Sequence, residues 1–433
     1  MKKICLIFVF VLLFLGAWGL FASPRHVNLV TIDGPIGPIT ARIIDQAIDA
    51  SVEDSAEALV IELNTPGGLD ESMRIITRKI LNSGVPQIVY VAPSGSRAAS
   101  AGVFITLSAH IAAMAPGTNM GSAHPVAIGG QMDSTMAEKV VNDAAAYIRS
   151  IANRRGRNEE WAEESVRQSV SATEYEALKL KVIDLVVDNV RALLDSCDGR
   201  TVSLPSGEKV LDTKEIEVRR AEISIRDKIL QVITNPTIAY ILLTLGIWGL
   251  FFELSNPGAI FPGIVGGICL ILAFFALQSL PINYAGLLLM ILALILFILE
   301  VKIVSHGALT IGGVISMVLG SLLLFESPLP YMRVSLVVIV TVVAGTALFF
   351  LIAIGLALRA RKRKVTTGGR GLTGEVGVAR TALKPEGDVF IHGEIWKAEA
   401  DEPVKKGEKV LVTGVEYLTL KVTKHKKQSA ENG

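Results

Sequence analysis

The chain has 433 residues, of which 51% are hydrophobic and 19% are charged, and its net charge is +1 at pH 7. This length allows two or three domains, and a mean hydropathy of +0.50 excludes a wholly soluble protein. The small net charge gives no overall field to attract nucleic acid. The three cysteines, which lie far apart, suggest neither a disulfide framework nor a metal site.

The N-terminal segment is expected to direct the chain to a membrane. Lys2 and Lys3 precede an apolar run that ends near Ala22, as in a signal peptide or an uncleaved anchor. Residues 1–22 are interpreted as such a segment. Cleavage stays open, because Leu20 is larger than the residue usually found three positions before a cleavage site. The domain that follows is expected to lie outside the cytoplasm.

Residues 25–226 predict an α/β domain with a largely parallel sheet. Strand-like apolar runs and helix-like amphipathic runs alternate over residues 26–36, 39–55, 58–68, 70–84 and 86–93. In open sheets of this kind ligands bind beyond the carboxyl ends of the strands. The Gly67-Gly68 turn and residues 94–102 both follow strand-like runs. These two loops are therefore expected to share one site.

The segment PSGSRAASAGVFITLSAH, residues 93–110, places four serines between a strand-like and a helix-like run. Ser100 is the best candidate nucleophile, because its alanine and glycine neighbours leave room for a substrate carbonyl. The alternative is a tight helix-packing surface whose serine bonds only to the backbone. Ser94, Ser96 and Ser108 lie close enough to stay open as candidates.

A nucleophilic serine also needs a base and donors for the oxyanion. Gly67 and Gly68 are candidate donors through their unobstructed backbone N–H groups. The histidines of the domain carry no catalytic pattern and are expected to be structural: His26, His110 and His124. Lys139 is the alternative base, because it lies early in a predicted helix whose macrodipole favours the neutral amine. A solvated lysine beside Glu138 is the other interpretation.

Residues 236–358 are nearly all apolar and predict a transmembrane bundle of about five spans. The expected spans are residues 237–253, 259–279, 284–301, 308–325 and 334–358. A loose repeat relates residues 253–267 to residues 300–314 and suggests a duplicated packing hairpin. A transport pathway is the alternative, which the scarcity of ionisable residues in the spans disfavours.

The basic cluster RARKRK at residues 359–364 follows the last expected span and indicates the cytoplasmic side. Residues 365–426 alternate valine-rich runs with turns and predict a small all-β barrel of the OB type. The barrel mixes lysine and glutamate and has few aromatic residues, which favours protein interaction or a structural role over nucleic-acid binding. Five spans would place the α/β domain outside and the barrel in the cytoplasm.

Three motifs in this order are similar to those of the long-form NfeD family: TPGG at 65–68, AASAGVFITLSAHIAAMAPGTNMGSAHPV at 98–126 and EKVVNDAAAYIRSIANRRGRN at 138–158. The order of α/β domain, membrane bundle and small barrel also resembles that family, whose extracytoplasmic domain is of the Clp protease and crotonase type. The resemblance implies a membrane-bound serine peptidase with a Ser-Lys dyad. The sequence shows no cluster of metal ligands and no phosphate-binding GxxxxGK[ST] loop, so the peptidase is expected to need no cofactor, metal or ATP.

By the same resemblance, Ser100 is the nucleophile, Lys139 is the general base, and the Gly67-Gly68 turn is part of the oxyanion hole. The family's partners are stomatin-like (SPFH) membrane proteins, whose hydrophobic segments some members cut. The resemblance thus implies such a partner or substrate, contact with membrane lipid, and a homo-oligomer.

Other function classes stay open. A crotonase-type acyl-CoA enzyme would share the sheet and the glycine donors, but it would need carboxylates near the loops. A non-catalytic membrane scaffold that partners stomatin-like proteins would need neither Ser100 nor Lys139. A transporter would need buried charge in the spans. Arg97, a bulky cation beside the expected site, could bind a substrate carboxylate or simply face water.

Overall fold

The computed structural model describes residues 25–126, 133–255, 258, 260–278, 280, 282–303, 305–325, 327, 332–361 and 369–425. The expected N-terminal signal or anchor, residues 1–22, and the last three residues of the basic cluster at 359–364 lie outside the described residues. The chain divides into two compact units, Met1–Ala347 and Leu348–Gly433.

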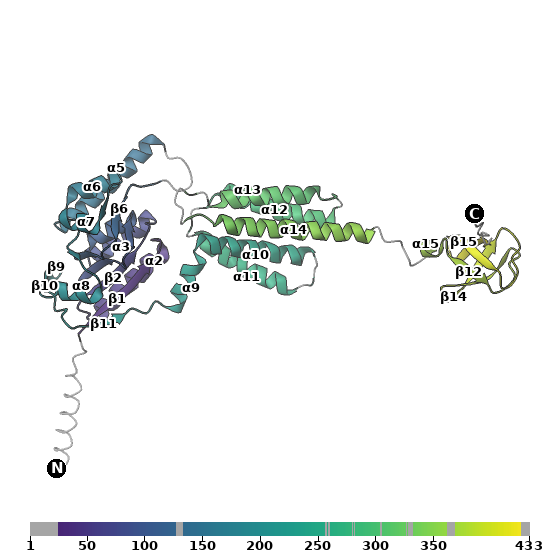
Figure 1. Ribbon diagram of the computed structural model, residues 1–433, viewed down its shortest axis with the longest axis horizontal. Coiled ribbons are helices and arrows are strands. Elements are labelled where there is room, and N and C mark those ends of the chain that lie inside the picture. Colours follow the sequence, from purple (N-terminus) through teal and green to yellow (C-terminus); the bar gives the residue numbers. More distant parts are fainter. Residues whose placement is uncertain are drawn as a thin grey trace, which may run out of the picture. The chain divides into compact units, whose positions relative to one another are not determined.

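A six-stranded, wholly parallel sheet forms the centre of the α/β domain (Figure 1). In sheet order its strands are β11 (Glu217–Arg220), β1 (His26–Asp33), β2 (Leu59–Asn64), β3 (Gln87–Val91), β5 (Ile111–Met114) and β8 (Leu185–Val186). All five residues of β3 are buried, as expected for a central strand that is covered on both faces. The expectation of a largely parallel sheet is confirmed.

Helices and a hairpin cover the two faces of this sheet. The larger core joins one face to α2 (Pro38–Glu53), α3 (Asp70–Leu81), α4 (Ala101–Ser108), α5 (Ser134–Arg154) and α6 (Glu159–Arg167). The smaller core joins the other face to α8 (Val190–Cys197) and to the hairpin of β9 (Thr201–Leu204) and β10 (Gly207–Val210). A second sheet of β4 (Arg97–Ala99), β6 (Asn119–Gly121) and β7 (Ser171–Thr173), followed by α7 (Glu174–Lys179), completes the domain.

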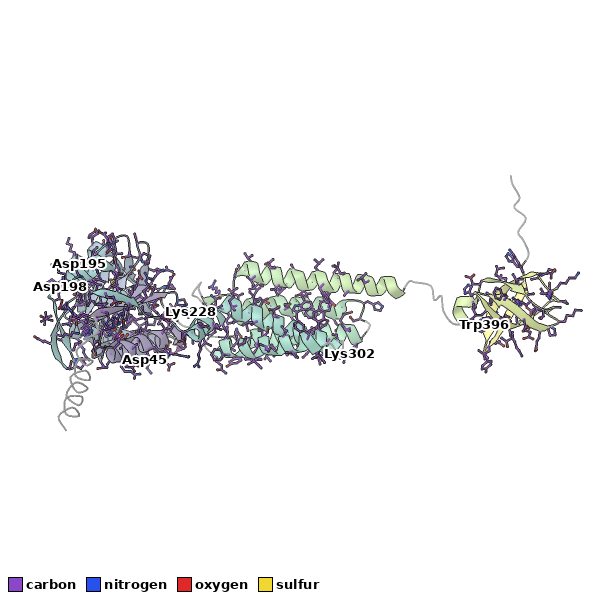
Figure 2. The ribbon with its side chains drawn as sticks, turned by 90° about the horizontal axis from the view of Figure 1, so that it is seen from below. Asp45, Asp195, Asp198, Lys228, Lys302 and Trp396 are labelled. Carbon is purple, nitrogen blue, oxygen red and sulfur yellow. The ribbon has the colours of Figure 1, made fainter. Side chains whose placement is uncertain are left out.

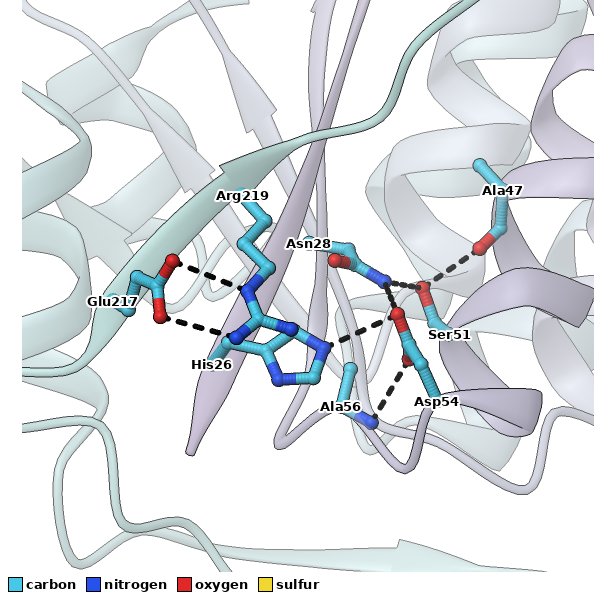
Figure 3. Close-up of polar contacts among 8 residues, drawn as sticks. All are labelled: His26, Asn28, Ala47, Ser51, Asp54, Ala56, Glu217 and Arg219. Carbon is cyan, nitrogen blue, oxygen red and sulfur yellow. Dashed lines mark hydrogen bonds and ion pairs between the residues drawn. The ribbon is translucent and has the colours of Figure 1, made fainter. Parts of the chain in front are cut away.

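A polar cluster ties the start of β1 to the end of α2, at the amino ends of the strands (Figure 3). His26 Nε2 lies 3.1 Å from Asp54 Oδ2, and Asn28 donates to Asp54 Oδ2 and to Ser51 Oγ, each at 3.0 Å. Partial burial opposes ionisation of Asp54, but the hydrogen bonds from Asn28 and His26 hold its pKa below the usual range. His26 therefore belongs to a structural cluster, at the opposite edge of the sheet from the strand-end loops.

Five apolar helices follow the α/β domain: α10 (Pro236–Ser255), α11 (Ile260–Gln278), α12 (Tyr284–Lys302), α13 (Ala308–Leu324) and α14 (Leu336–Arg361). In the described part of the chain, four are long and apolar enough to cross a membrane: α10, α11, α12 and, within α14, Leu336–Ala353. Helix α13 is apolar but shorter. The chain is therefore a membrane protein, and the fifth span remains a prediction.

The apolar helices pack as two hairpins, α10 with α11 and α12 with α13. Glycines permit the close approach within each: a Cβ on Gly249 would lie 2.4 Å from Gly266 Cα, and one on Gly286 would lie 2.5 Å from Leu324 N. The carboxylate of Glu300 accepts hydrogen bonds from the backbone N–H of Gly307 at 3.1 Å and Thr310 at 3.0 Å. Glu300 thus caps α13, as suits a packing hairpin.

The C-terminal unit contains the short helix α15 (Gly369–Leu372) and a closed five-stranded barrel. Its strands, in barrel order, are β12 (Val376–Ala379), β13 (Glu386–Ile391), β14 (Glu394–Ala400), β16 (Thr419–Lys424) and β15 (Lys409–Glu416). Only β14 and β16 pair in parallel. Alternate side chains such as Val389, Val410 and Leu420 fill the interior. The predicted fold class is confirmed: an α/β domain, an all-α apolar bundle and a small β-barrel.

Candidate active site

Ser100 lies at a sharp turn between β4 and α4. Its backbone has φ +53° and ψ −114°, a conformation that costs a non-glycine residue of the order of 1–3 kcal/mol. Two hydrogen bonds of 3.0 Å hold the turn: Ser100 N–H donates to Gly121 O, and Val103 N–H donates to Ser100 O. A strained serine at a strand-to-helix turn is typical of an exposed nucleophile.

The Gly67-Gly68 turn packs directly against Ser100. A Cβ on Gly67 would lie 2.6 Å from Ser100 Cβ, and one on Gly68 would lie 2.0 Å from Ile36 O. Both positions therefore require glycine. The N–H of Gly67 donates to Thr65 Oγ1 at 3.1 Å, whereas the N–H of Gly68 has no partner among the described residues.

Ala101 supplies a second free backbone donor beside Ser100. It is the first residue of α4, and its N–H has no hydrogen-bond partner in the described part of the chain. The positive end of the helix dipole lies at the same point. Sequence reasoning missed Ala101, because a backbone donor requires no particular residue type and so leaves no mark in a sequence.

Lys139 reaches the same site from α5. Ser100, Lys139 and Gly68 all line one cavity of about 360 Å³. Lys139 is exposed and has no ion-pair partner among the described residues, and no hydrogen bond joins it to Ser100 there. Much of the remaining wall is apolar, with Met73, Ala101, Phe104, Val126, Val140 and Ala144. The structure therefore brings the predicted nucleophile and base together at an apolar cavity.

An arginine on α3 holds α5 beside the cavity. Arg74 Nη2 lies 2.5 Å from Asp143 Oδ2, its Nε lies 2.8 Å from Asp70 Oδ2, and its guanidinium lies 4.6 Å from the Tyr147 ring centroid. Partial burial favours the neutral guanidine, but the two aspartates raise the pKa of Arg74 above its usual value. Asp143 is one helical turn after Lys139. Its carboxylate is paired with Arg74.

The other candidate serines lie outside this cavity wall. Ser96 and Ser108 are buried, and Ser108 Oγ donates to Ile105 O at 2.7 Å. Ser94 Oγ lies where a Cβ on Gly117 would meet it at 2.8 Å. Arg97 is exposed on β4 and is likewise absent from the cavity wall. Of the four serines, only Ser100 lines the cavity.

The two histidines nearest in sequence bond to the backbone instead of Ser100. His110 Nδ1 accepts the N–H of Gln87 at 3.1 Å. Burial, with the nearby charges of Arg155, Arg157 and Arg154, lowers the pKa of His110 to about 3. His124 Nδ1 lies 2.8 Å from Val166 O. Among the residues that the structure describes, no group of three His, Cys, Asp or Glu side chains is arranged to hold a metal ion.

Three family models match the chain. They are the N-terminal domain of NfeD1b over residues 26–220, the NfeD integral membrane domain over residues 237–354, and the NfeD-like C-terminal, partner-binding domain over residues 369–424. These matches follow the same order as the α/β domain, the apolar helices and the barrel.

Relatives match along nearly the whole length. The membrane-bound protease PH1510 of Pyrococcus horikoshii is 38% identical over 444 residues, which covers 100% of both chains. The membrane protein NfeD1b of Bacillus subtilis is 28% identical and covers 91% of this chain and 92% of that protein. A mutant of the 1510-N membrane-bound stomatin-specific protease, solved with a substrate peptide, is 36% identical over 48% of this chain and 97% of that chain, with a TM-score of 0.45.

Proposed function

Since the chain belongs to the NfeD family, we propose that it is a membrane-bound serine endopeptidase with Ser100 as nucleophile and Lys139 as general base. The observation that carries this proposal is the shared cavity, which Ser100, Lys139 and Gly68 all line. The strained turn at Ser100 and the free donors beside it support the same chemistry.

The reaction follows from the roles of these groups. Ser100 Oγ attacks the peptide carbonyl while its proton passes to the neutral amine of Lys139. The N–H groups of Gly68 and Ala101 stabilise the oxyanion, and Gly67 permits the close approach of the turn. Lys139 then protonates the leaving amine, and an acyl group remains on Ser100. Water releases this acyl group by the reverse proton path.

The substrate class is proposed from the cavity wall and the relatives. An apolar wall that includes Met73, Phe104 and Val140 suits aliphatic or aromatic side chains. A solved relative is described as stomatin-specific, and the barrel region matches a partner-binding domain. We propose that the enzyme cuts hydrophobic segments of stomatin-like membrane proteins. A scaffold that only binds such proteins is the alternative.

We expect the purified full chain in detergent to hydrolyse peptides rich in aliphatic residues without ATP or added metal. The reason is that the proposed mechanism needs only Ser100, Lys139 and backbone donors. Peptide cleavage is followed by mass spectrometry in the presence of a chelator, with Ser100→Ala as the control. A strict requirement for nucleotide, loss of activity with the chelator, or equal cleavage by Ser100→Ala would contradict the proposal.

We also propose that α13 is a fifth span, which puts the α/β domain and the barrel on opposite sides of the membrane. The basic cluster at residues 359–364 then assigns the barrel to the cytoplasm and the α/β domain to the outside. Labelling of introduced cysteines in intact cells tests on which side of the membrane each domain lies. A membrane-impermeant reagent should label Glu160→Cys, near Asn158, and should not label Glu386→Cys. The reverse pattern would refute the orientation, and labelling of both positions would mean an even number of spans.

A further inference from the structure

Helix α9 (Ile225–Ile233) is fixed to the α/β domain by its inner face. Leu230 packs against the main core. Asp227 is buried, its Oδ1 lies 3.7 Å from Arg42 Nη1 on α2, and its backbone N–H donates to Ser224 Oγ at 3.1 Å. These contacts set the rotation of the helix on the domain.

The opposite face of α9 is apolar and exposed. Ile225 is 78% exposed, Ile229 is 53% exposed and Val232 is 58% exposed. The spacing i, i+4, i+7 places the three side chains in one stripe. Arg226 and Lys228, the latter labelled in Figure 2, are also exposed and have no ion-pair partner among the described residues. The helix thus combines an uncovered apolar stripe with unpaired positive charge.

The chain itself places this stripe near a bilayer. Helix α9 ends at Ile233, and the first span, α10, begins at Pro236. Only Thr234 and Asn235 separate the two helices, and so short a link reaches at most about 10 Å. An amphipathic helix in a membrane interface buries its apolar face by roughly 5–10 Å. The end of α9 is therefore within reach of the lipid headgroups.

We propose that α9 lies in the headgroup layer of the bilayer, with Ile225, Ile229 and Val232 inserted among the lipids. Arg226 and Lys228 then contact the phosphates of anionic lipids. Because the inner face of α9 is anchored to α2, this insertion holds the α/β domain at the membrane surface. The inference does not depend on which residues carry out catalysis.

The test measures lipid contact at two neighbouring positions of α9 in the full chain. In a background with Cys5, Cys197 and Cys269 replaced by alanine, Ile229→Cys carries a bimane fluorophore. Gln231→Cys, on the polar side of the same helix, is the matched control. Both proteins are reconstituted in vesicles of phosphatidylcholine and phosphatidylglycerol that contain a lipid with a nitroxide near the top of its acyl chain.

We expect the nitroxide lipid to quench the probe at position 229 several-fold more than the probe at position 231. Equal quenching at the two positions would overturn the proposal. A probe at 229 that is shielded from both nitroxide lipid and water, and that becomes exposed when the protein is diluted in lipid, would also overturn it. That result would assign the stripe to contact between two copies of the chain.

The charged residues give an independent measurement. Replacing the phosphatidylglycerol by phosphatidylcholine, or introducing Arg226→Gln with Lys228→Gln, should reduce the quenching at position 229. Quenching that is unchanged in both experiments would refute the assigned role of the two cations.

Discussion

Ser100→Ala and Lys139→Ala are each expected to lower kcat/KM for peptide hydrolysis by at least about a thousandfold, and the double variant should be no slower than either. The losses overlap because an unactivated hydroxyl is a poor nucleophile, and a base without that hydroxyl has no proton to accept. Initial rates for the purified full chain, with circular dichroism to verify folding, provide the measurement.

Lys139→Arg is the sharpest companion variant. It keeps the positive charge and most of the length, but a guanidinium cannot accept a proton in a protein. We therefore expect Lys139→Arg to be as inactive as Lys139→Ala. The wild-type rate should rise with pH, because the base works only after Lys139 has lost its proton. Ser96→Ala and His124→Ala should keep much of the rate.

A different pattern would replace the dyad. If His124→Ala abolished turnover while Lys139→Ala retained most of it, with both variants folded, a Ser-His arrangement would have to be considered. The strained turn at Ser100 and the donors of Gly68 and Ala101 would be unaffected by that outcome.

The second large effect concerns stability. Arg157→Ala is expected to lower the free energy of unfolding of the α/β domain by about 3–5 kcal/mol. The Arg157 side chain is only 3% exposed. Its Nη1 donates to Leu107 O at 2.6 Å and Ala109 O at 2.8 Å, and its Nη2 donates to Asp184 Oδ2 at 2.7 Å. Removing it leaves two carbonyls and a carboxylate without this donor.

Hydrogen exchange of the full chain can measure this change, since the amides of β3 and β5 report the opening of the core. Arg154→Ala is the matched control, because Arg154 is exposed and makes one hydrogen bond of 3.1 Å, to Leu81 O. Arg154→Ala should lower the free energy of unfolding by about 1 kcal/mol or less. Equal changes in the two variants would show that the buried position of Arg157 does not matter.

The sequence predicted those parts of the fold that leave a local pattern. The strands β1 to β3 are apolar runs, the helices α2 and α3 are amphipathic, and the glycine turn and the serine loop follow two of the strands. Because carboxyl ends of parallel strands share one edge, the meeting of Gly68 and Ser100 could also be expected. Helix α14 and the apolar helices before it could be predicted from the length of their apolar runs alone.

Other features depend on contacts between residues that are far apart in the sequence, and no local sequence pattern predicts them. Strand β11 has the sequence EVRR, which lacks an apolar run, and it becomes a strand because it pairs with β1. The ion pair between Arg74 and Asp143 joins residues 69 positions apart. The N–H of Ala101 is available only because Ser100 turns the chain into α4. Tertiary packing decides each of these.

The most direct test of the central claim is to trap the acyl group that the mechanism places on Ser100. The full chain is mixed with an aliphatic peptide ester and quenched with acid during turnover, and tandem mass spectrometry locates the bound acyl group. We predict acylation of Ser100 in the wild type and little or none in Lys139→Arg at the same time point. Acylation of Ser94 or Ser96 instead of Ser100, or turnover with no acylated residue, would contradict the proposed nucleophile.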